Sequence, residues 1–285
     1  MQTRPQDLGH LTPDEVAALA VLAERAAREA GALVRGGRPD RVDVSATKSS
    51  PVDVVTEMDL ASERLLVQVL LGERPDDGVL GEEDGLRAGT SGVTWVVDPI
   101  DGTVNYLYGV PAYAVSVAAV VGDPDPATWT VVAGAVHAVP DGRTWTAARG
   151  HGARLDGRAL TIGEPRPLAQ SLCGTGFGYR AERRRAQARV LGHVLPLVRD
   201  IRRIGSAAMD LCSVASGQLD VYYERGLNPW DLAAASLVAE EAGAAVVGLR
   251  GTRAGAAMTV AGHPDTVPAL VEVLEAAGAD SDEPA

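Results

Sequence analysis

The stretch Trp95-Val96-Val97-Asp98-Pro99-Ile100-Asp101-Gly102-Thr103-Val104-Asn105-Tyr106 decides how the rest of this sequence is interpreted. Its apolar, β-branched start predicts a buried strand, which we expect Pro99 to end because proline cannot donate to a strand ladder. Asp98 and Asp101 would then lie at the carboxyl end of that strand. Gly102 lets the backbone approach a ligand, and Thr103 offers a backbone N–H that can receive an anion. Two carboxylates beside an anion cradle predict a divalent metal, Mg²⁺, held against a phosphate.

Asp-Pro-x-Asp-Gly turns are also common on protein surfaces for backbone reasons alone, so this stretch by itself leaves an ordinary turn open. Two further acidic groups favour the metal site. Gly81-Glu82-Glu83-Asp84 follows the apolar run Gly78-Val79-Leu80, and Pro229-Trp230-Asp231 precedes an alanine-rich helix expected over residues 232–242. Acidic side chains therefore lie at three predicted strand or helix ends.

These three motifs together resemble the inositol monophosphatase family. Its signatures are a Gly-Glu-Glu element, a Trp-x-x-Asp-Pro-Ile-Asp-Gly-Thr-x-Asn-[Phe/Tyr] element and a late Trp-Asp element, and all three occur here in that order. The resemblance covers about residues 48–261. Tyr106 stands where the family often has phenylalanine, and the glycine-rich segment 174–179 is more similar to bacterial than to animal members.

The resemblance implies two or three Mg²⁺ ions in one active site. The implied ligands of the first ion are Glu82, Asp98 and the backbone carbonyl of Ile100, and those of the second are Asp98, Asp101 and Asp231. A third, weaker ion is implied near Lys48. A metal pair neutralises the charge of a phosphate monoester and stabilises the attacking and leaving oxygens. From its position alone, Asp231 could instead be a first-turn acid that the helix dipole favours.

Catalytic roles are implied for Asp59, Thr103 and Glu82. The first two would position the attacking water, and the metal held by Glu82 would assist its deprotonation, with no covalent enzyme intermediate. Spacing alone gives Asp59 a simpler role, since it follows Thr56 by three residues and fits a helix capping box.

Substrate-binding roles are implied for Gly102, Thr103, Gly205, Ser206, Ala207 and Glu224. Backbone N–H groups of the first two would bind phosphate oxygens, and the Gly-Ser-Ala turn would line a polyol pocket. The same turn is also an ordinary helix start. Glu224 would accept hydrogen bonds from substrate hydroxyls and is the main candidate for specificity.

Composition limits the possible partners. The net charge of −12 and a pI near 4.9 disfavour a nucleic-acid surface. Without a charge-free run of eighteen residues or an apolar amino terminus, we expect a cytoplasmic protein with no membrane partner. Cys173 and Cys212 are predicted to be buried free thiols. The basic residues Arg180 and Arg183-Arg184-Arg185 are expected to form a solvated face at the start of a helix.

The hydrophobic pattern predicts two kinds of architecture along the chain. A capping box at Thr12-Pro13-Asp14-Glu15 predicts a helix ending near Gly36. A second helix from about Thr56 to Leu71, with strands between residues 79 and 148, predicts a mostly antiparallel sheet with helices. After Pro167, strands and helices alternate as in α/β proteins.

The overall fold class is therefore α+β to α/β, and the resemblance implies a layered α-β-α-β-α sandwich. We expect residues 1–168 to form an α+β half with most metal ligands, and residues 169–285 an α/β half with Glu224 and Asp231, in one compact unit. The acidic tail 279–285 is expected to be disordered.

The expected activity is Mg²⁺-dependent hydrolysis of a small-molecule phosphate monoester, with myo-inositol 1-phosphate as the preferred substrate. Fructose-1,6-bisphosphatase, histidinol-phosphatase and nucleotide 3′-phosphatase activities remain alternatives on the same metal core. A bisphosphate would need a second cationic pocket, which Arg202, Arg203 or Arg225 could supply. A regulatory binding protein that retains the fold is an alternative of another class. The resemblance also implies a homodimer and inhibition by Li⁺ at the second metal site.

Overall fold

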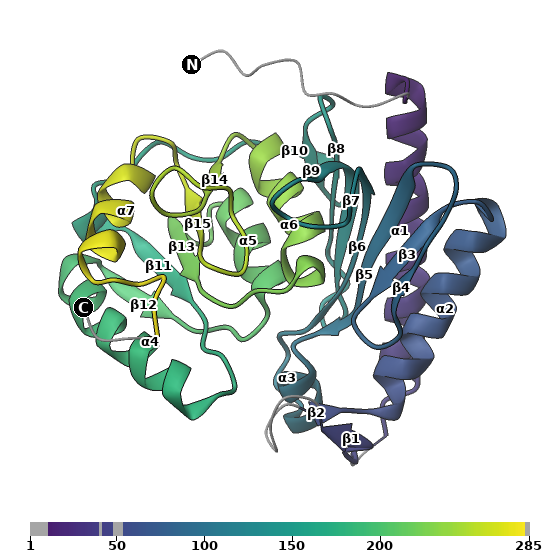
Figure 1. Ribbon diagram of the computed structural model, residues 1–285, viewed down its shortest axis with the longest axis horizontal. Coiled ribbons are helices and arrows are strands. Elements are labelled where there is room, and N and C mark those ends of the chain that lie inside the picture. The colour runs from purple at the N-terminus through teal and green to yellow at the C-terminus, as the bar shows by residue number, and fades with distance from the viewer. Residues whose placement is uncertain (1–10, 40–41, 48–53, 283–285) are drawn as a thin grey trace.

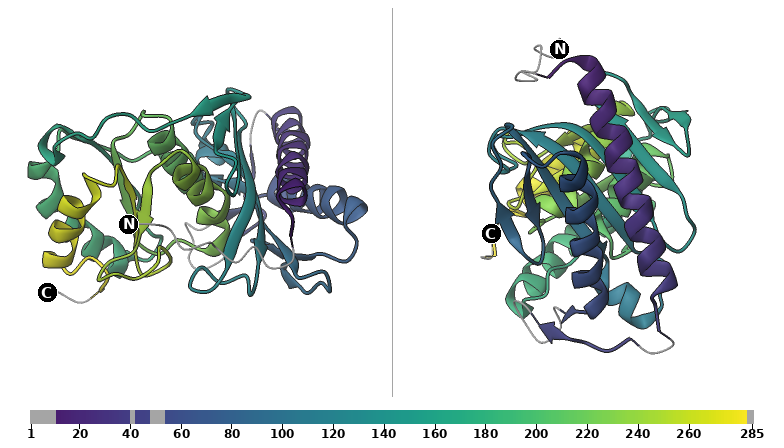
Figure 2. Two further views of the ribbon diagram at one scale, coloured as in Figure 1. Left: turned by 90° about the horizontal axis from the view of Figure 1, so that it is seen from above. Right: turned by 90° about the vertical axis from the view of Figure 1, so that its right-hand side faces the viewer.

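Helices and sheets alternate in layers through this protein (Figures 1 and 2). The computed structural model describes residues 11–39, 42–47 and 54–282, so Lys48 lies outside the described part of the chain. Helices α1 (Pro13–Gly36) and α2 (Glu57–Glu73) cover one face of an eight-stranded sheet. Helices α5 (Ala207–Ala215) and α6 (Pro229–Glu241) lie between this sheet and a five-stranded sheet, and α4 (Ala181–Val194) and α7 (Val267–Ala276) cover the far side. The predicted α-β-α-β-α sandwich is confirmed.

The eight-stranded sheet has the order β10-β9-β8-β7-β6-β5-β3-β4 and is antiparallel except where β3 pairs with β5. Its strands are β3 (Gly78–Gly81), β4 (Gly85–Arg87), β5 (Val93–Asp101), β6 (Ala114–Val121), β7 (Thr130–Ala138), β8 (Thr144–Ala148), β9 (Ala153–Leu155) and β10 (Arg158–Leu160). The sequence missed β4, β9 and β10 because each has only three residues and lacks an alternating apolar pattern.

Strand β5 corrects the expectation that Pro99 ends the strand. The strand continues to Asp101, but its register with β6 shifts between Asp98, opposite Ser116, and Asp101, opposite Ala114. Pro99 lies in this bulge, where the ladder is interrupted and no donor is needed. In a regular strand two residues three apart face opposite sides of the sheet. The extra residue of the bulge lets Asp98 and Asp101 point into the same cleft.

The five-stranded sheet has the order β12-β11-β13-β15-β14. Strands β12 (Asp200–Arg202), β11 (Leu172–Thr175) and β13 (Val221–Glu224) are parallel, whereas β15 (Thr259–Gly262) and β14 (Ala245–Val247) run antiparallel to their neighbours. The short elements β1 (Ala46–Thr47), β2 (Val54–Val55), α3 (Thr103–Tyr108), η1 (Leu168–Gln170) and η2 (Leu195–Leu197) complete the described chain. Glu224 is the last residue of β13, at the carboxyl end of the parallel strands β12, β11 and β13.

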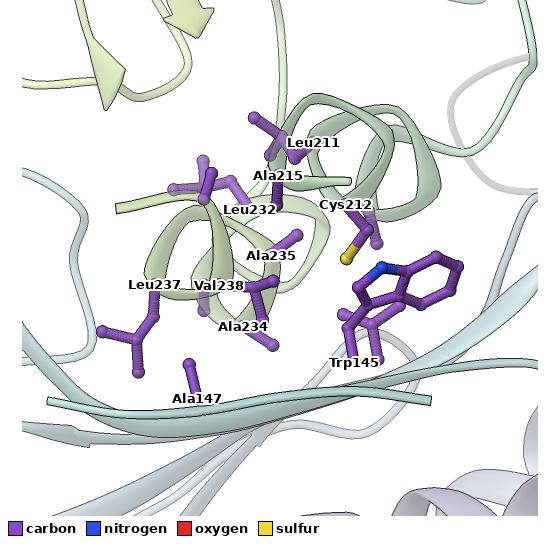
Figure 3. Close-up of a cluster of buried hydrophobic side chains, with 14 of the residues drawn as sticks. Trp145, Ala147, Leu211, Cys212, Ala215, Leu232, Ala234, Ala235, Leu237 and Val238 are labelled. Carbon is purple, nitrogen blue, oxygen red and sulfur yellow. The ribbon is translucent and has the colours of Figure 1, made fainter. Parts of the chain in front are cut away.

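Small side chains let the middle helices pack closely on the first sheet (Figure 3). Trp145 of β8 is buried against Cys212 of α5, and Ala234 of α6 faces the same sheet. The indole of Trp145 donates a hydrogen bond to the Ser216 hydroxyl at 2.7 Å. A Cβ added at Gly134 of β7 would lie 2.9 Å from the Cα of Ala234. This close packing fixes the position of the N-terminal ends of α5 and α6 over β5.

The C-terminal residues depart from the expected disorder as far as Asp282. Ala279 is buried, Asp280 pairs with Arg250, and Asp282 pairs with both Arg183 and Arg225. Ion pairs that the acidic composition could not reveal hold this segment against the body of the protein. Both cysteines are buried free thiols, as predicted. Among the described residues, no helix is long and apolar enough to cross a membrane.

Candidate active site

Three carboxylates from two layers converge at the end of β5. Asp98 and Asp101 come from β5, and Asp231 is the third residue of α6. One carboxylate oxygen from each lies within 4.8 Å of the other two. Glu82, in the turn after β3, lines the same cleft, as does Ile100. The structure thus brings together residues from all three acidic motifs.

Helix N-termini hold two of these carboxylates in place. Asp101 Oδ2 accepts hydrogen bonds from the Ser206 hydroxyl at 2.6 Å and from the backbone N–H of Ala208 at 2.7 Å. Asp231 Oδ2 accepts one from the backbone N–H of Asn228 at 2.6 Å, within a capping box. Asp231 is therefore both a helix-capping acid and a member of the cluster, so its two interpretations are compatible.

Burial and mutual repulsion make this cluster costly without a cation. Burial raises the pKa of Asp101 to about 6, although hydrogen bonds from Ser206 and Ala208 oppose the increase. Burial also raises the pKa of Asp231 well above its usual range, and the charges of Asp101 and Glu82 add to the effect. A divalent cation among these oxygens would remove the repulsion, and an all-carboxylate set suits a hard cation such as Mg²⁺. The residues present therefore fit the implied metal.

Asp59 contacts the cleft through Thr103. The Thr103 hydroxyl lies 3.0 Å from Asp59 Oδ1 and 3.1 Å from the carbonyl oxygen of Ile100. Asp59 Oδ2 accepts a hydrogen bond from the backbone N–H of Thr56 at 2.8 Å, so the predicted capping box is also present. Burial raises the pKa of Asp59, against the hydrogen bonds from Thr56 and Thr103. One side chain thus caps α2 and supports a residue that lines the cleft.

Glu63 is a supporting residue that the sequence analysis missed. Its carboxylate is buried and accepts hydrogen bonds from the backbone N–H groups of Glu83 at 3.0 Å and Asp84 at 2.8 Å. It therefore holds the turn that carries Glu82. A Cβ at Gly81 would lie 2.4 Å from Glu63 Oε1, so the glycine of the Gly-Glu-Glu motif makes room for this carboxylate. The sequence carried no signal of this contact, because Glu63 lies 20 residues before the turn that it holds.

A buried amide fixes the glycine turns on either side of the cleft. Asn105 Nδ2 donates to the carbonyl oxygens of Ala112 at 2.7 Å and Ile204 at 2.9 Å. This links α3 to the turn before α5. Gly102 and Gly205 have φ values of +100° and +93°, a region that favours glycine. The two backbone segments implied in phosphate and substrate binding are therefore held at a fixed separation.

Glu224 lies across the cleft from β5. Its Oε2 accepts a hydrogen bond from the Tyr222 hydroxyl at 2.7 Å. A Cβ on Gly176 would clash with this carboxylate, so the glycine-rich segment provides the space that Glu224 occupies. Burial raises the pKa of Glu224 to about 7, and the charge of Asp101 raises it further while the Tyr222 hydrogen bond lowers it.

The cleft has a cavity volume of about 520 Å³, and its lining contains arginines as well as acids. All the predicted site residues line it except Asp59; these are Glu82, Asp98, Ile100, Asp101, Gly102, Thr103, Gly205, Ser206, Ala207, Glu224 and Asp231. Four arginines also line it: Arg180, Arg183, Arg203 and Arg225. Arg202 is exposed, pairs with Asp200 and is not one of the lining residues.

The sequence predicted that Arg180 and Arg183 belong to a solvated face. The structure corrects this, because both residues line the cleft. Arg183 is only 27% exposed, and its guanidinium packs against Gly226, immediately after Arg225. The sequence could not reveal this because α4 reaches the cleft only after the second sheet has formed. No motif marks such a contact.

Comparisons with known proteins identify the class. The model of the inositol monophosphatase family matches residues 15–279, and the chain belongs to this family. It is 48% identical over 284 residues to the inositol-1-monophosphatase of Mycobacterium bovis, covering 92% of this chain and 96% of that protein. It is therefore a phosphatase by family.

Two further relatives bear on function and fold. The Nus factor SuhB of Pasteurella multocida is 36% identical over 232 residues, covering 81% of this chain and 85% of that protein. The solved structure of Mycobacterium tuberculosis SuhB matches with a TM-score of 0.76 at 45% identity, over 91% of this chain and 96% of that one.

Proposed function

We propose that this protein hydrolyses myo-inositol 1-phosphate to myo-inositol and phosphate in a Mg²⁺-dependent reaction. The observation that supports this best is the convergence of Asp98, Asp101 and Asp231, with Glu82 lining the same cleft. The 48% identity to an inositol-1-monophosphatase favours the same substrate. Four acids facing one polar cleft suit a metal-bound phosphate, whereas an apolar ligand would leave their charges uncompensated.

The metal ligands we propose are those implied by the sequence. Glu82, Asp98 and the carbonyl of Ile100 would hold one Mg²⁺, and Asp98, Asp101 and Asp231 a second. When bound, the ions neutralise the phosphate ester and lower the pKa of water. Any third ion near Lys48 falls outside the described residues.

The chain's own contribution to the reaction begins with Thr103. If its hydroxyl donates its single proton to Asp59 Oδ1, 3.0 Å away, its lone pairs can accept a hydrogen bond from the attacking water. Asp59 is fixed by Thr56, so the hydroxyl keeps this orientation. Thr103 thus orients the water, and the hydrogen bonds from Thr56 and Thr103 favour the ionised Asp59 carboxylate that this role needs, against the effect of burial on its pKa.

We expect backbone groups and side chains to bind different parts of the substrate. Backbone N–H groups of Gly102 and Thr103 would bind phosphate oxygens, and the turn Gly205–Ala207 would line the polyol pocket. Glu224, oriented by Tyr222, would accept hydrogen bonds from ring hydroxyls. Glu82 and Glu224 both line the cleft, which supports placing metal and polyol recognition in one site.

The first test is metal dependence. Removing metal with a chelator should abolish phosphate release from myo-inositol 1-phosphate, and Mg²⁺ should restore it. Asp98→Asn should lower the rate by at least ~10³-fold because it removes a ligand shared by both ions. Li⁺ should inhibit, and less strongly as Mg²⁺ increases. Full activity of Asp98→Asn would contradict the proposed metal pair.

A substrate panel tests the rest of the proposal. We expect myo-inositol 1-phosphate to have a higher kcat/KM than histidinol phosphate or a nucleoside 3′-phosphate, measured as phosphate release. A preference for either of the others would overturn the substrate assignment but leave the phosphatase class intact. Absence of hydrolysis with every ester, at saturating Mg²⁺, would favour the regulatory alternative.

Two organisational expectations also remain proposals. We expect a homodimer, and light scattering at assay concentration would detect it as twice the 29.5 kDa chain mass. The second expectation is that the chain divides into two halves between residues 168 and 169. The strands of the two sheets fall on either side of this boundary.

A further inference from the structure

Arg203 is a cation in the cleft to which the proposed reaction gives no role. It lies in the loop between β12 and α5 and lines the cavity together with Glu224. A Cβ on Gly205 would lie 2.4 Å from Arg203 Nη1 and 3.3 Å from its Cζ. The guanidinium therefore lies over the backbone of Gly205, which lines the same cavity, instead of extending away from the cleft.

The charge of Arg203 acts on three acids around this part of the cleft. Burial is the largest influence on the pKa values of Asp101, Asp210 and Glu224 and raises all three, whereas the charge of Arg203 lowers each of them. The three acids belong to β5, α5 and β13. Because these elements converge on the cleft, a guanidinium that acts on all three acids faces the space where a substrate would bind.

Arg203 and Glu224 interact through their charges without being in contact. Among the described residues Arg203 forms no hydrogen bond and no ion pair, so none of its nitrogens lies within 4.0 Å of a Glu224 carboxylate oxygen. The Tyr222 hydroxyl donates to Glu224 Oε2, which leaves Oε1 as an acceptor for a ligand. The cleft thus presents a cationic donor and an anionic acceptor with a gap between them.

A hydroxyl group fits such a gap because it both donates and accepts hydrogen bonds. A guanidinium only donates and a carboxylate only accepts, so a hydroxyl between them satisfies both, with contacts of about 2.7–3.0 Å on each side. The planar guanidinium also presents two parallel N–H groups, which match two neighbouring oxygens. Two hydroxyls on adjacent carbons therefore fit Arg203 better than a single hydroxyl does.

We propose that Arg203 is a specificity-determining residue that binds two adjacent hydroxyl groups of the substrate's alcohol, donating to both oxygens while Glu224 accepts from one of them. The proposal rests on the proposed phosphatase function and adds a donor to a pocket in which Glu224 supplies the acceptor. Arg203 takes no part in cleaving the P–O bond. The selected feature is a vicinal diol on a substrate that carries a single phosphate.

Two esters that differ by one hydroxyl test this recognition. Glycerol 3-phosphate carries a vicinal diol, whereas 3-hydroxypropyl phosphate has the same chain and terminal hydroxyl but lacks the middle one. Phosphate release at saturating Mg²⁺ gives the ratio of kcat/KM, diol over monohydroxy ester. This ratio should be at least ~10 for the wild type, and Arg203→Gln should lower it by roughly 10-fold, the scale of one lost hydrogen bond to a charged group.

Arg203→Lys separates the planar donor pair from the charge. Lysine keeps the positive charge but lacks two parallel N–H groups, so its ratio should stay within about 3-fold of that of Arg203→Gln. Arg202→Gln is the matched control, since this neighbouring arginine is exposed, pairs with Asp200 and is not one of the lining residues. It should leave the ratio unchanged.

The outcomes separate this proposal from the proposed function. Equal kcat/KM of the wild type for the two esters, or a wild-type ratio in Arg203→Gln, would refute the diol site and leave the phosphatase in place. Full recovery of the ratio in Arg203→Lys would also refute it, because the charge alone would then suffice. An equal loss in Arg202→Gln would refute it as well, by tracing the change to a disturbed β12. If the wild type releases phosphate from no ester, including a simple aryl phosphate, the proposed function itself fails.

Discussion

Glu224 shows how one residue can be tuned by its immediate neighbours. Tyr222 donates a hydrogen bond to its Oε2, and Gly176 leaves room for the carboxylate. Its pKa of about 7 is raised mainly by burial, so near neutral pH it exchanges between charged and neutral forms in the metal-free protein. A bound metal pair nearby would favour the charged form, which is the stronger acceptor for substrate hydroxyls.

Replacing Glu224 by glutamine should therefore be selective. Glu224→Gln keeps the shape and can still accept the Tyr222 hydrogen bond, but it loses the charge. Turnover of myo-inositol 1-phosphate should fall by roughly 10- to 100-fold, the scale of one or two lost charge-assisted hydrogen bonds.

An aryl phosphate without ring hydroxyls serves as the comparison. Its kcat/KM should change much less in the same variant. Equal losses of kcat/KM on the two substrates would show that Glu224 supports the metal site instead.

At this scale the sequence was informative wherever a residue belongs to a motif. Every predicted site residue except Asp59 lines one cleft, and Asp59 accepts a hydrogen bond from Thr103, which lines it. Their ligand and catalytic roles stay predictions. Glu63 and Arg183 could not be identified because their roles depend on contacts 20 or more residues away along the chain, with the Glu82 turn and with Asp282.

Single strands and helices determine which way the site carboxylates point. The bulge in β5 directs two carboxylates to one side, and α5 and α6 present their N-terminal turns to the same point. Sequence patterns predicted the long strands and the longer helices because their apolar residues repeat over many positions, whereas the six-residue helix α3 was not predicted. The bulge itself was mistaken for a strand end, since a proline in a ladder gives the same local signal in both cases.

The contact between β7 and α6 gives a prediction at this scale. Gly134→Ala should lower the free energy of unfolding by about 1–3 kcal/mol, because the new methyl would overpack against Ala234. Thermal or denaturant unfolding of the metal-free protein measures the effect.

Gly192→Ala is the matched control. This exposed glycine lies within α4 and has open space around it, so alanine should stabilise by up to about 1 kcal/mol. A Gly134→Ala variant as stable as wild type would mean that α6 can move away from the sheet, contrary to the close packing described above.

For the molecule as a whole, the buried acids predict an unusual pH dependence in the absence of metal. Burial raises the pKa of Asp101 to about 6 and of Glu224 to about 7, above their values in an unfolded chain. The folded state therefore binds more protons than the unfolded state between about pH 4.5 and 7. The free energy of unfolding of the chelator-treated protein should increase as pH falls from 8 to 5.

His137 has the opposite effect on how stability depends on pH. Burial lowers its pKa in the folded protein, so it favours the unfolded state as pH falls below about 6.5. The effect of this one histidine on stability is opposed by that of several acids whose pKa values are raised, among them Asp210 and Asp231. With saturating Mg²⁺ the pH slope should disappear or reverse, since protons then compete with the metal. Denaturant titrations at several pH values, with and without Mg²⁺, test this; a metal-free protein that loses stability from pH 8 to 6 would contradict it.

The position of Asp231 also has a consequence for the order of events during folding. Asp98 and Asp101 belong to the first sheet, but Asp231 is supplied by α6, which must pack between the two sheets before the cluster exists. A divalent ion can therefore be captured fully only late, after the layers have assembled. Such an ion stabilises the native state by mass action, and it should act chiefly by slowing unfolding, with little effect on the rate of refolding. Metal supply would then govern how long the folded protein lasts more than how quickly it forms.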